Sequence, residues 1–168
     1  MIYMKEEFNY IVKDILNNKK VKLMNDFRQH FDTNTYEHSY SVAYISYKIC
    51  KKLKLDYKSA ARAALLHDFY LYDWRTNEVR LHGFKHPRIS LNNAIKEFNL
   101  NNKEKDIILK HMWPLTIIPP KSVEGFIVTL ADKIATYKET TKYIKEKCKE
   151  CKPFKYAYLF ILFVIKKI

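Results

Sequence analysis

Apolar residues recur along this 168-residue chain mainly at intervals of three and four, and alternation of apolar and polar residues is rarely sustained over five positions. This spacing predicts amphipathic helices, because one face of an α-helix repeats every 3.6 residues. We therefore expect an all-α fold of one domain, with 48% hydrophobic residues to form its core. The predicted helices cover residues 4–16, 34–53, 56–69, 87–98, 102–113 and 122–147.

Polar residues and a proline mark several of the predicted helix starts. Asn34, Asp56 and Asn102 are each expected to act as an N-cap, because their side chains accept hydrogen bonds from free backbone amides. Pro87 suits a first helical turn, where its missing N–H has no partner to lose. Between two of these helices, residues 70–86 form a polar connector.

Composition excludes several common kinds of site. The two glycines, Gly83 and Gly125, lie in no glycine-rich phosphate-binding frame, so a Rossmann or P-loop nucleotide site is not expected. Three cysteines are too few for a disulfide framework, and Cys148 and Cys151 form a lone C-x-x-C that we interpret as incidental. No signal peptide is visible in residues 1–20, so a cytoplasmic location is expected.

The chain is strongly basic, with a formal net charge of +13, and its end combines lysines with an apolar run over residues 156–165. Ten helical residues rise only about 15 Å, which is half the thickness of a bilayer core, so this run does not span a membrane by itself. We expect it to pack on the core. The alternatives are an anionic membrane surface or a homodimer interface, and the basic charge also leaves nucleic acid open as a partner.

Ionisable residues occupy predicted inward faces. His38, for example, shares a helical stripe with Val42, Ile45 and Ile49. A single buried histidine is usually a hydrogen-bonded core residue, but a group of buried imidazoles and carboxylates needs a shared partner. A divalent metal is such a partner. The predicted inward group is His38, His67, Asp68, His86, His111 and Asp132.

The order of these residues resembles a known pattern. His38, the dipeptide His67-Asp68 and Asp132 resemble the H…HD…D signature of the HD-domain superfamily, which consists largely of metal-dependent phosphohydrolases built on a helical bundle. We call these four the HD-signature residues. The resemblance covers residues 34–137. The additional His86 and His111 resemble the six-ligand branch that holds two metals.

The resemblance implies an HD-domain core over residues 31–147, between an N-terminal helical segment over 1–30 and a tail over 148–168. It implies that the HD-signature residues hold one divalent ion, and that Asp68 bridges to a second ion held by His86 and His111. Neighbouring helical residues point about 100° apart, so the adjacent ligands His67 and Asp68 require a helix end or a kink there. Nitrogen and oxygen ligands suit Fe, Mn, Co, Ni or Zn.

His82, four residues before His86, is an alternative ligand, but the Pro87 and helix that follow His86 match the family layout better. The resemblance further implies a hydroxide between the metals that attacks a phosphomonoester, a phosphodiester or a nucleotide pyrophosphate. We expect a small phosphorylated substrate, such as a nucleotide. Asp68 is the expected catalytic ligand, and Asp73 is a candidate hydrogen-bond acceptor for a ligand histidine or proton shuttle.

Four cations near the dipeptide are candidate phosphate clamps, because guanidinium and ammonium groups bind phosphate oxygens. They are Arg75, Arg80, Lys85 and Arg88.

Departures from the pattern narrow the substrate. No Gly-Tyr-Pro motif is present, so cyclic-dinucleotide hydrolysis is not supported. Leu71 replaces the Glu of guanosine-tetraphosphate hydrolases and simple deoxynucleotidases, which disfavours their substrates. It also replaces the Lys of the symmetrical diadenosine-tetraphosphate hydrolases, whose substrate stays open. Two other hypotheses remain: a mixed-valent di-iron oxygenase with the same ligands, and a non-catalytic module that binds nucleic acid or membrane. The pocket around Trp74, Phe84 and Trp113 is expected to decide the substrate.

Overall fold

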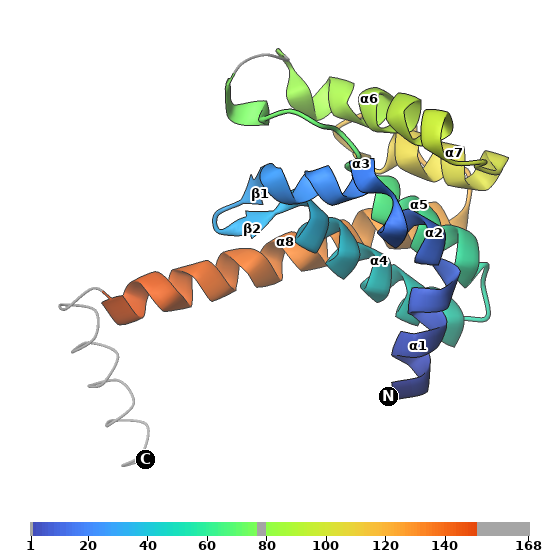
Figure 1. Ribbon diagram of the computed structural model, residues 1–168, viewed down its shortest axis with the longest axis horizontal. Coiled ribbons are helices and arrows are strands. Elements are labelled where there is room, and N and C mark those ends of the chain that lie inside the picture. Colours follow the sequence, from blue (N-terminus) through green and yellow to red (C-terminus); the bar gives the residue numbers. More distant parts are fainter. Residues whose placement is uncertain (1, 77–79, 151–168) are drawn as a thin grey trace.

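The computed structural model describes residues 2–76 and 80–150, which are mostly helical, and this confirms the predicted all-α fold. Figure 1 shows α4, α5 and the first half of α8 packed together, with α6 and α7 side by side against this group. The helices of the described residues are α1 (Ile2–Ile11), α2 (Lys13–Asn17), α3 (Lys19–Lys22), α4 (Thr35–Lys52), α5 (Tyr57–Leu66), α6 (His82–Glu97), α7 (Asn102–Lys110) and α8 (Val123–Glu150). Short 3₁₀ turns, η1 (Leu23–Asp26) and η2 (Trp74–Thr76), and strands β1 (Arg28–His30) and β2 (Thr33–Asn34) complete them.

Two of the three predicted N-caps are confirmed. The Asn34 side chain accepts from the backbone N of Glu37, and Asp56 accepts from that of Ser59. The third prediction is wrong by one residue, because Asn101 caps α7 and Asn102 is its first helical residue. The Glu104 carboxylate bonds back to the Asn101 backbone N–H, and this reciprocal capping box fixes the start of the helix.

Helix α6 begins at His82, five residues before the predicted start, so Pro87 lies inside the helix and not in its first turn. The missing Pro87 N–H removes one helical bond, the one to the Gly83 carbonyl, while the preceding turn is retained. The earlier start places His82 and His86 one turn apart on the same face, where their rings stack with centroids 4.5 Å apart. This arrangement brings His82 to the edge of the site described below.

The N-terminal region departs from the single helix predicted over residues 4–16. The helix is interrupted at Val12, which separates α1 from α2. A small antiparallel hairpin of β1 and β2 follows, and Phe31 in its turn has a positive φ of 49°. Strands of two and three residues are too short to produce a readable alternation, so the hairpin is not predictable from the apolar pattern.

The core lies around α4 and α5. Four buried alanines on α5 allow neighbouring helices to approach it closely, and Tyr47 on α4 packs against Phe8 of α1. Phe8, Val12 and Met24 belong to the same buried cluster as residues of α4 and α5. The N-terminal helices therefore share one core with the rest, and the predicted boundary at residue 30 stays a prediction. The four alanines are Ala60, Ala61, Ala63 and Ala64.

Helix α8 is 28 residues long, and its C-terminal end extends beyond the bundle (Figure 1). Its first half carries Asp132 into the interior face and packs against α4. Within residues 2–76 and 80–150, no helix is long and apolar enough to cross a membrane. Cys151 and the apolar run over 156–165 lie outside the described residues, so their predicted roles stay predictions.

Candidate metal centre

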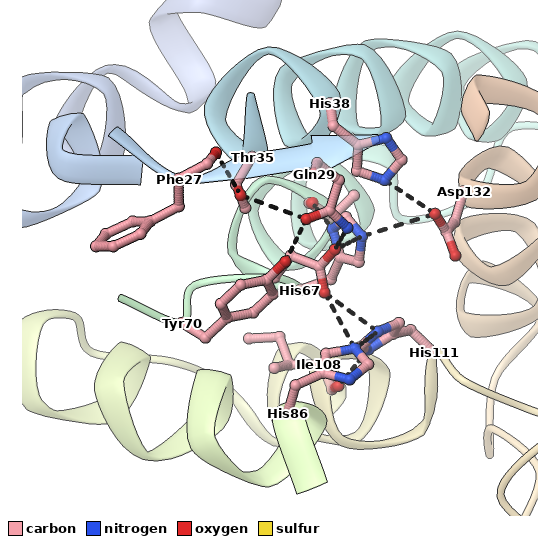
Figure 2. Close-up of polar contacts among 12 residues, drawn as sticks. Phe27, Gln29, Thr35, His38, His67, Tyr70, His86, Ile108, His111 and Asp132 are labelled. Carbon is pink, nitrogen blue, oxygen red and sulfur yellow. Dashed lines mark hydrogen bonds and ion pairs between the residues drawn. The ribbon is translucent and has the colours of Figure 1, made fainter. Parts of the chain in front are cut away.

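The six predicted ligands meet in the interior of the bundle, although they come from five helices (Figure 2). Helix α5 ends at Leu66, so the adjacent His67 and Asp68 leave the helix at its C-terminus and turn toward the same space. Asp132 is the most accessible ligand, with 18% of its side chain exposed, and the other five are buried. The other contributions are His38 from α4, His86 from α6, His111 from the end of α7 and Asp132 from α8.

The Asp68 carboxylate is the centre of this group. Its Oδ1 lies 3.1 Å from the Nε2 of His86 and 3.5 Å from the Nε2 of His111. Its Oδ2 lies 3.3 Å from the Nε2 of His67. Burial opposes ionisation of Asp68, but the His67 and His86 rings lower its pKa well below the usual value. The carboxylate is therefore charged and faces three imidazoles.

The backbone sets which nitrogen of each imidazole carries the proton. The Nδ1 of His67 lies 2.7 Å from the Ala64 carbonyl, that of His86 2.9 Å from the His82 carbonyl, and that of His111 2.8 Å from the Ile108 carbonyl. A carbonyl oxygen only accepts, so each Nδ1 is the donor. All three Nε2 atoms lie within 3.5 Å of an Asp68 oxygen. Each would present a lone pair to a metal as a neutral ring, whereas without a metal, and despite burial, the Asp68 carboxylate raises the pKa of His67 and favours a proton there.

Without a cation, this arrangement leaves polar atoms unsatisfied. Among the described residues, the buried Nε2 of His67 and Oδ1 of Asp68 form no well-aligned hydrogen bond, although each lies close to an oppositely charged or polar atom of the cluster. The Nε2 atoms of His86 and His111 lie only 2.9 Å apart. Burial and the neighbouring rings of His67 and His86 lower the pKa of His111 to about 3, so His111 does not supply a second proton. A divalent ion would satisfy the lone pairs and the carboxylate together, so the residues present fit a metal.

Two clusters of potential ligand atoms share Asp68. One consists of His38, His67 and Asp68, and the other of Asp68, His86 and His111; within each, the atoms lie within 4.8 Å of one another. Asp68 is therefore the one residue common to both groups of potential metal ligands.

His38 differs from the other three predicted ligand histidines because its ring lies between two carboxylates. Its Nε2 lies 3.0 Å from Asp132 Oδ1, and its Nδ1 lies 3.0 and 3.1 Å from the two oxygens of Glu139. Burial alone would lower the pKa of His38, but the bonds to Asp132 and Glu139 raise it to about 10. Glu139 was not predicted, although its spacing of seven residues after Asp132 places it on the same face of α8.

A second unpredicted group holds Asp68 from the other side. The Gln29 side chain, on β1, donates to Asp68 Oδ2 at 2.6 Å, while its own carbonyl oxygen accepts from the Tyr70 and Thr35 hydroxyls (Figure 2). The Thr35 hydroxyl also lies 3.0 Å from the Phe27 carbonyl. The hairpin therefore serves to aim Gln29 at the centre. A lone glutamine outside any predicted helix carries no sequence signal for such a role.

The structure distinguishes the positions of His82 and His86. His86 directs its Nε2 at Asp68, whereas the His82 Nδ1 lies 2.9 Å from the Tyr72 hydroxyl. Burial and the nearby His86 lower the pKa of His82 to about 4. The Trp74 ring stacks on His82 with centroids 5.6 Å apart. His82 is thus part of an aromatic wall beside the centre, and it belongs to neither of the two clusters of potential ligand atoms around Asp68.

A pocket of about 270 Å³ opens onto the centre. Its wall includes Trp74 and His82 on one side and Thr136 on the other, and His30, which was not predicted, also lines it. Phe84 lines a neighbouring groove instead, and the Trp113 ring packs edge-on against Phe126. Only one of the three aromatic residues expected around the pocket, Trp74, therefore lines it.

The predicted clamp residues and Asp73 lie outside this pocket lining. Arg75 pairs with Asp73, with 2.8 Å between Nε and Oδ1, and this arginine lowers the pKa of Asp73 to about 2. Arg80, Lys85 and Arg88 are exposed, and Arg88 lines the neighbouring groove. The binding roles of these four cations and the proton-shuttle role of Asp73 stay predictions.

The helical bundle and its buried histidine–aspartate cluster define a metal-binding domain. A family model for the HD domain matches residues 35–137, and the chain therefore belongs to the HD-domain family, a superfamily of metal-dependent phosphohydrolases. The matched range contains all six predicted ligands but ends before Glu139 and begins after Gln29. No significant match was found among curated proteins or among solved structures.

Proposed function

We propose that this protein is a phosphohydrolase with two divalent metal ions at the centre around Asp68. His38, His67, Asp68 and Asp132 would hold one ion, and His86 and His111 would hold the other together with Asp68. The observation that supports the proposal is the convergence of three imidazole Nε2 atoms on the buried Asp68 carboxylate, while the Nδ1 atom of each ring faces a backbone carbonyl.

Bound divalent ions at such a centre supply an activated water molecule and polarise phosphoryl oxygens. Two such ions against the charges of Asp68 and Asp132 leave the site positive, so it attracts phosphate. The chain's own residues orient the ligands. Glu139 holds the Nδ1–H of His38, which leaves Nε2 free for a metal, and Gln29 fixes one oxygen of Asp68.

The pocket supports a small phosphorylated substrate, since its volume of about 270 Å³ lies just below the range of about 300–1,000 Å³ that is typical of small-molecule sites. A phosphoryl group and a short part of the substrate fill such a space. The stacked rings of Trp74 and His82 form a flat wall of the pocket, against which the leaving group of the substrate would lie. A nucleotide base is one group that would stack there.

The test combines metal analysis with an assay of phosphoester hydrolysis. Protein loaded separately with Mn, Fe, Co, Ni and Zn is expected to bind two ions per chain and to release phosphate from part of a panel of mono- and diesters. Asp68→Ala is expected to abolish both the second ion and the activity. Asp32→Ala removes a carboxylate that is 68% exposed and serves as the control, with both properties retained.

Two other experimental outcomes would favour one of the alternative functions over phosphohydrolysis. Oxygen consumption in the iron-loaded protein, without phosphate release, would favour the di-iron oxygenase hypothesis. Protein that holds no metal, but binds nucleic acid or anionic vesicles with unchanged salt dependence in Asp68→Ala, would favour the non-catalytic hypothesis.

A further inference from the structure

A groove of about 510 Å³ lies between α6 and the loop that joins α7 to α8. Its lining includes Phe84, Leu115, Ile117 and Ile118, which are exposed by 54%, 46%, 93% and 66%. Single exposed apolar residues are ordinary, but a contiguous apolar patch on a soluble domain marks a binding surface. The volume also lies within the range of about 300–1,000 Å³ that is typical of small-molecule sites.

The groove adjoins the pocket of the metal centre at Gly83. Gly83 lines the pocket and the next residue, Phe84, lines the groove. A Cβ on Gly83 would lie 3.1 Å from Leu115 Cδ2, in the groove, and 3.9 Å from Met112 Cε, in the pocket. Gly83 therefore lies close to Leu115 of the groove and to Met112 of the pocket, and the two cavities are neighbours at this residue.

The chemistry of the lining indicates what kind of group the groove accepts. Six of its nine lining residues are apolar, and the remaining three are Arg88, Lys110 and Thr116. The Lys110 ammonium is already paired with Asp106 at 2.7 Å. A nucleobase or sugar would leave most of its polar edges without partners here, and that would be costly. An aliphatic chain would not.

We propose that the groove binds the aliphatic chain of the substrate, and that the substrate is a phosphate monoester of a single aliphatic chain taken up from solution. This inference rests on the proposed function, which places the phosphoryl group at the centre around Asp68. The chain then passes Gly83 and lies against Phe84, Leu115 and Ile118. Arg88, exposed beside it, adds positive charge to the approach of an anionic amphiphile.

The test compares methyl, butyl and octyl phosphate, each below its aggregation threshold, with the metal-loaded protein. We expect kcat/KM for octyl phosphate to exceed that for methyl phosphate at least tenfold, because each buried methylene strengthens binding. Phe84→Ser is expected to reduce this ratio to nearly one. Leu130→Ser removes an apolar side chain of the same exposure, 53%, that does not line the groove, and it should keep the wild-type ratio.

A binding measurement separates this inference from the proposed function. Calorimetry on the metal-free protein is expected to show tighter binding of octyl than of methyl phosphate, and Phe84→Ser should remove the difference. If no ester is hydrolysed but this binding preference is found, the phosphohydrolase assignment is wrong and the proposal that the groove binds an aliphatic chain is supported. If methyl phosphate is hydrolysed and chain length has no effect on turnover or binding, the groove proposal is overturned and the phosphohydrolase stands.

Vesicles test the competing occupant. Wild-type protein that binds phosphatidylglycerol–phosphatidylcholine vesicles through Phe84, but shows no preference among the three soluble esters, would identify a membrane-docking surface and overturn the proposal. Circular dichroism of Phe84→Ser and Leu130→Ser establishes that both variants are folded before either comparison is made.

Discussion

The Nε2 atoms of His86 and His111 lie 2.9 Å apart, while the Nδ1 atom of each ring faces a backbone carbonyl. Neutral imidazoles in this orientation oppose two lone pairs, which a hydrogen bond between them cannot relieve without an extra proton. A divalent ion held by His86, His111 and Asp68 would relieve this opposition. The contact between α6 and the end of α7 therefore includes two ring nitrogens that a bound metal ion would satisfy.

Metal binding is therefore expected to stabilise the fold. At a free Mn²⁺ concentration of about 100 times the dissociation constant, the free energy of unfolding should rise by about 2.7 kcal/mol. His111→Asn should lose most of this increase, because it removes one ligand from the cluster of Asp68, His86 and His111. Urea unfolding with and without Mn²⁺ measures both values. An equal increase in unfolding free energy in wild type and His111→Asn would contradict the assignment of His111 as a metal ligand.

The two neighbouring histidines of α6 should respond differently to substitution. His86→Asn is expected to lose one ion per chain, because its Nε2 lies 3.1 Å from Asp68 Oδ1. His82→Asn should keep both ions, because the His82 ring bonds to Tyr72 and only its backbone carbonyl supports His86. Elemental analysis of the metal content of both variants shows which of the two histidines is a ligand. Loss of an ion in His82→Asn alone would assign the ligand to His82.

Glu139 is expected to control the pH dependence of stability in the metal-free protein. The pKa of His38 is raised to about 10 by its carboxylate partners, from about 6.5 in an unfolded chain. The folded state therefore binds this proton more tightly. Its stabilising effect is complete below about pH 6.5 and is lost as the pH rises toward 10.

Glu139→Gln keeps an acceptor for the His38 ring but removes the charge, so the decline in unfolding free energy between pH 6.5 and 9 should be smaller in this variant. Urea unfolding with a chelator present, at three pH values, measures the slope. Glu146→Gln, an exposed residue seven positions further along α8, is the control and should keep the wild-type slope. Equal slopes in Glu139→Gln and wild type would show that Glu139 does not act on His38.

Gln29 is expected to affect metal affinity although it is not a ligand. It donates to Asp68 Oδ2 at 2.6 Å, and loss of such a supporting bond typically weakens metal binding about 10–100-fold. Gln29→Leu should show this loss by metal titration. Tyr70→Phe removes only a bond to Gln29 and should have a smaller effect. Affinity that falls more in Tyr70→Phe would mean that the hairpin does not position Asp68.

The capping box of α7 offers a test of the fold itself. Asn101→Ala removes the acceptor of the Glu104 amide and should lower the free energy of unfolding by about 1 kcal/mol. Asn102→Ala, one residue further along and equally exposed, should change it by much less. Chemical denaturation of the two variants distinguishes the observed cap from the predicted one.

Much of the fold was predictable because helical periodicity is a local property. Residues 34–53 and 56–69 were expected as helices, and α4 and α5 lie there. The start of α6 was not predictable, because Pro87 looks like a first-turn residue, while the stacking of His82 on His86 continues the helix backwards. The hairpin was missed because its strands are too short to show alternation.

The sequence by itself determined which residues could form a metal centre, because an imidazole or a carboxylate on an apolar helix face needs a partner wherever the helix packs. Only the tertiary structure decided how they are arranged. The tautomers of His67, His86 and His111 depend on a backbone carbonyl about one turn earlier. His38 and Asp68 depend on Glu139 and Gln29, which lie 101 and 39 residues away. Contacts between residues so far apart in the chain follow from helix packing, and local sequence patterns do not contain them.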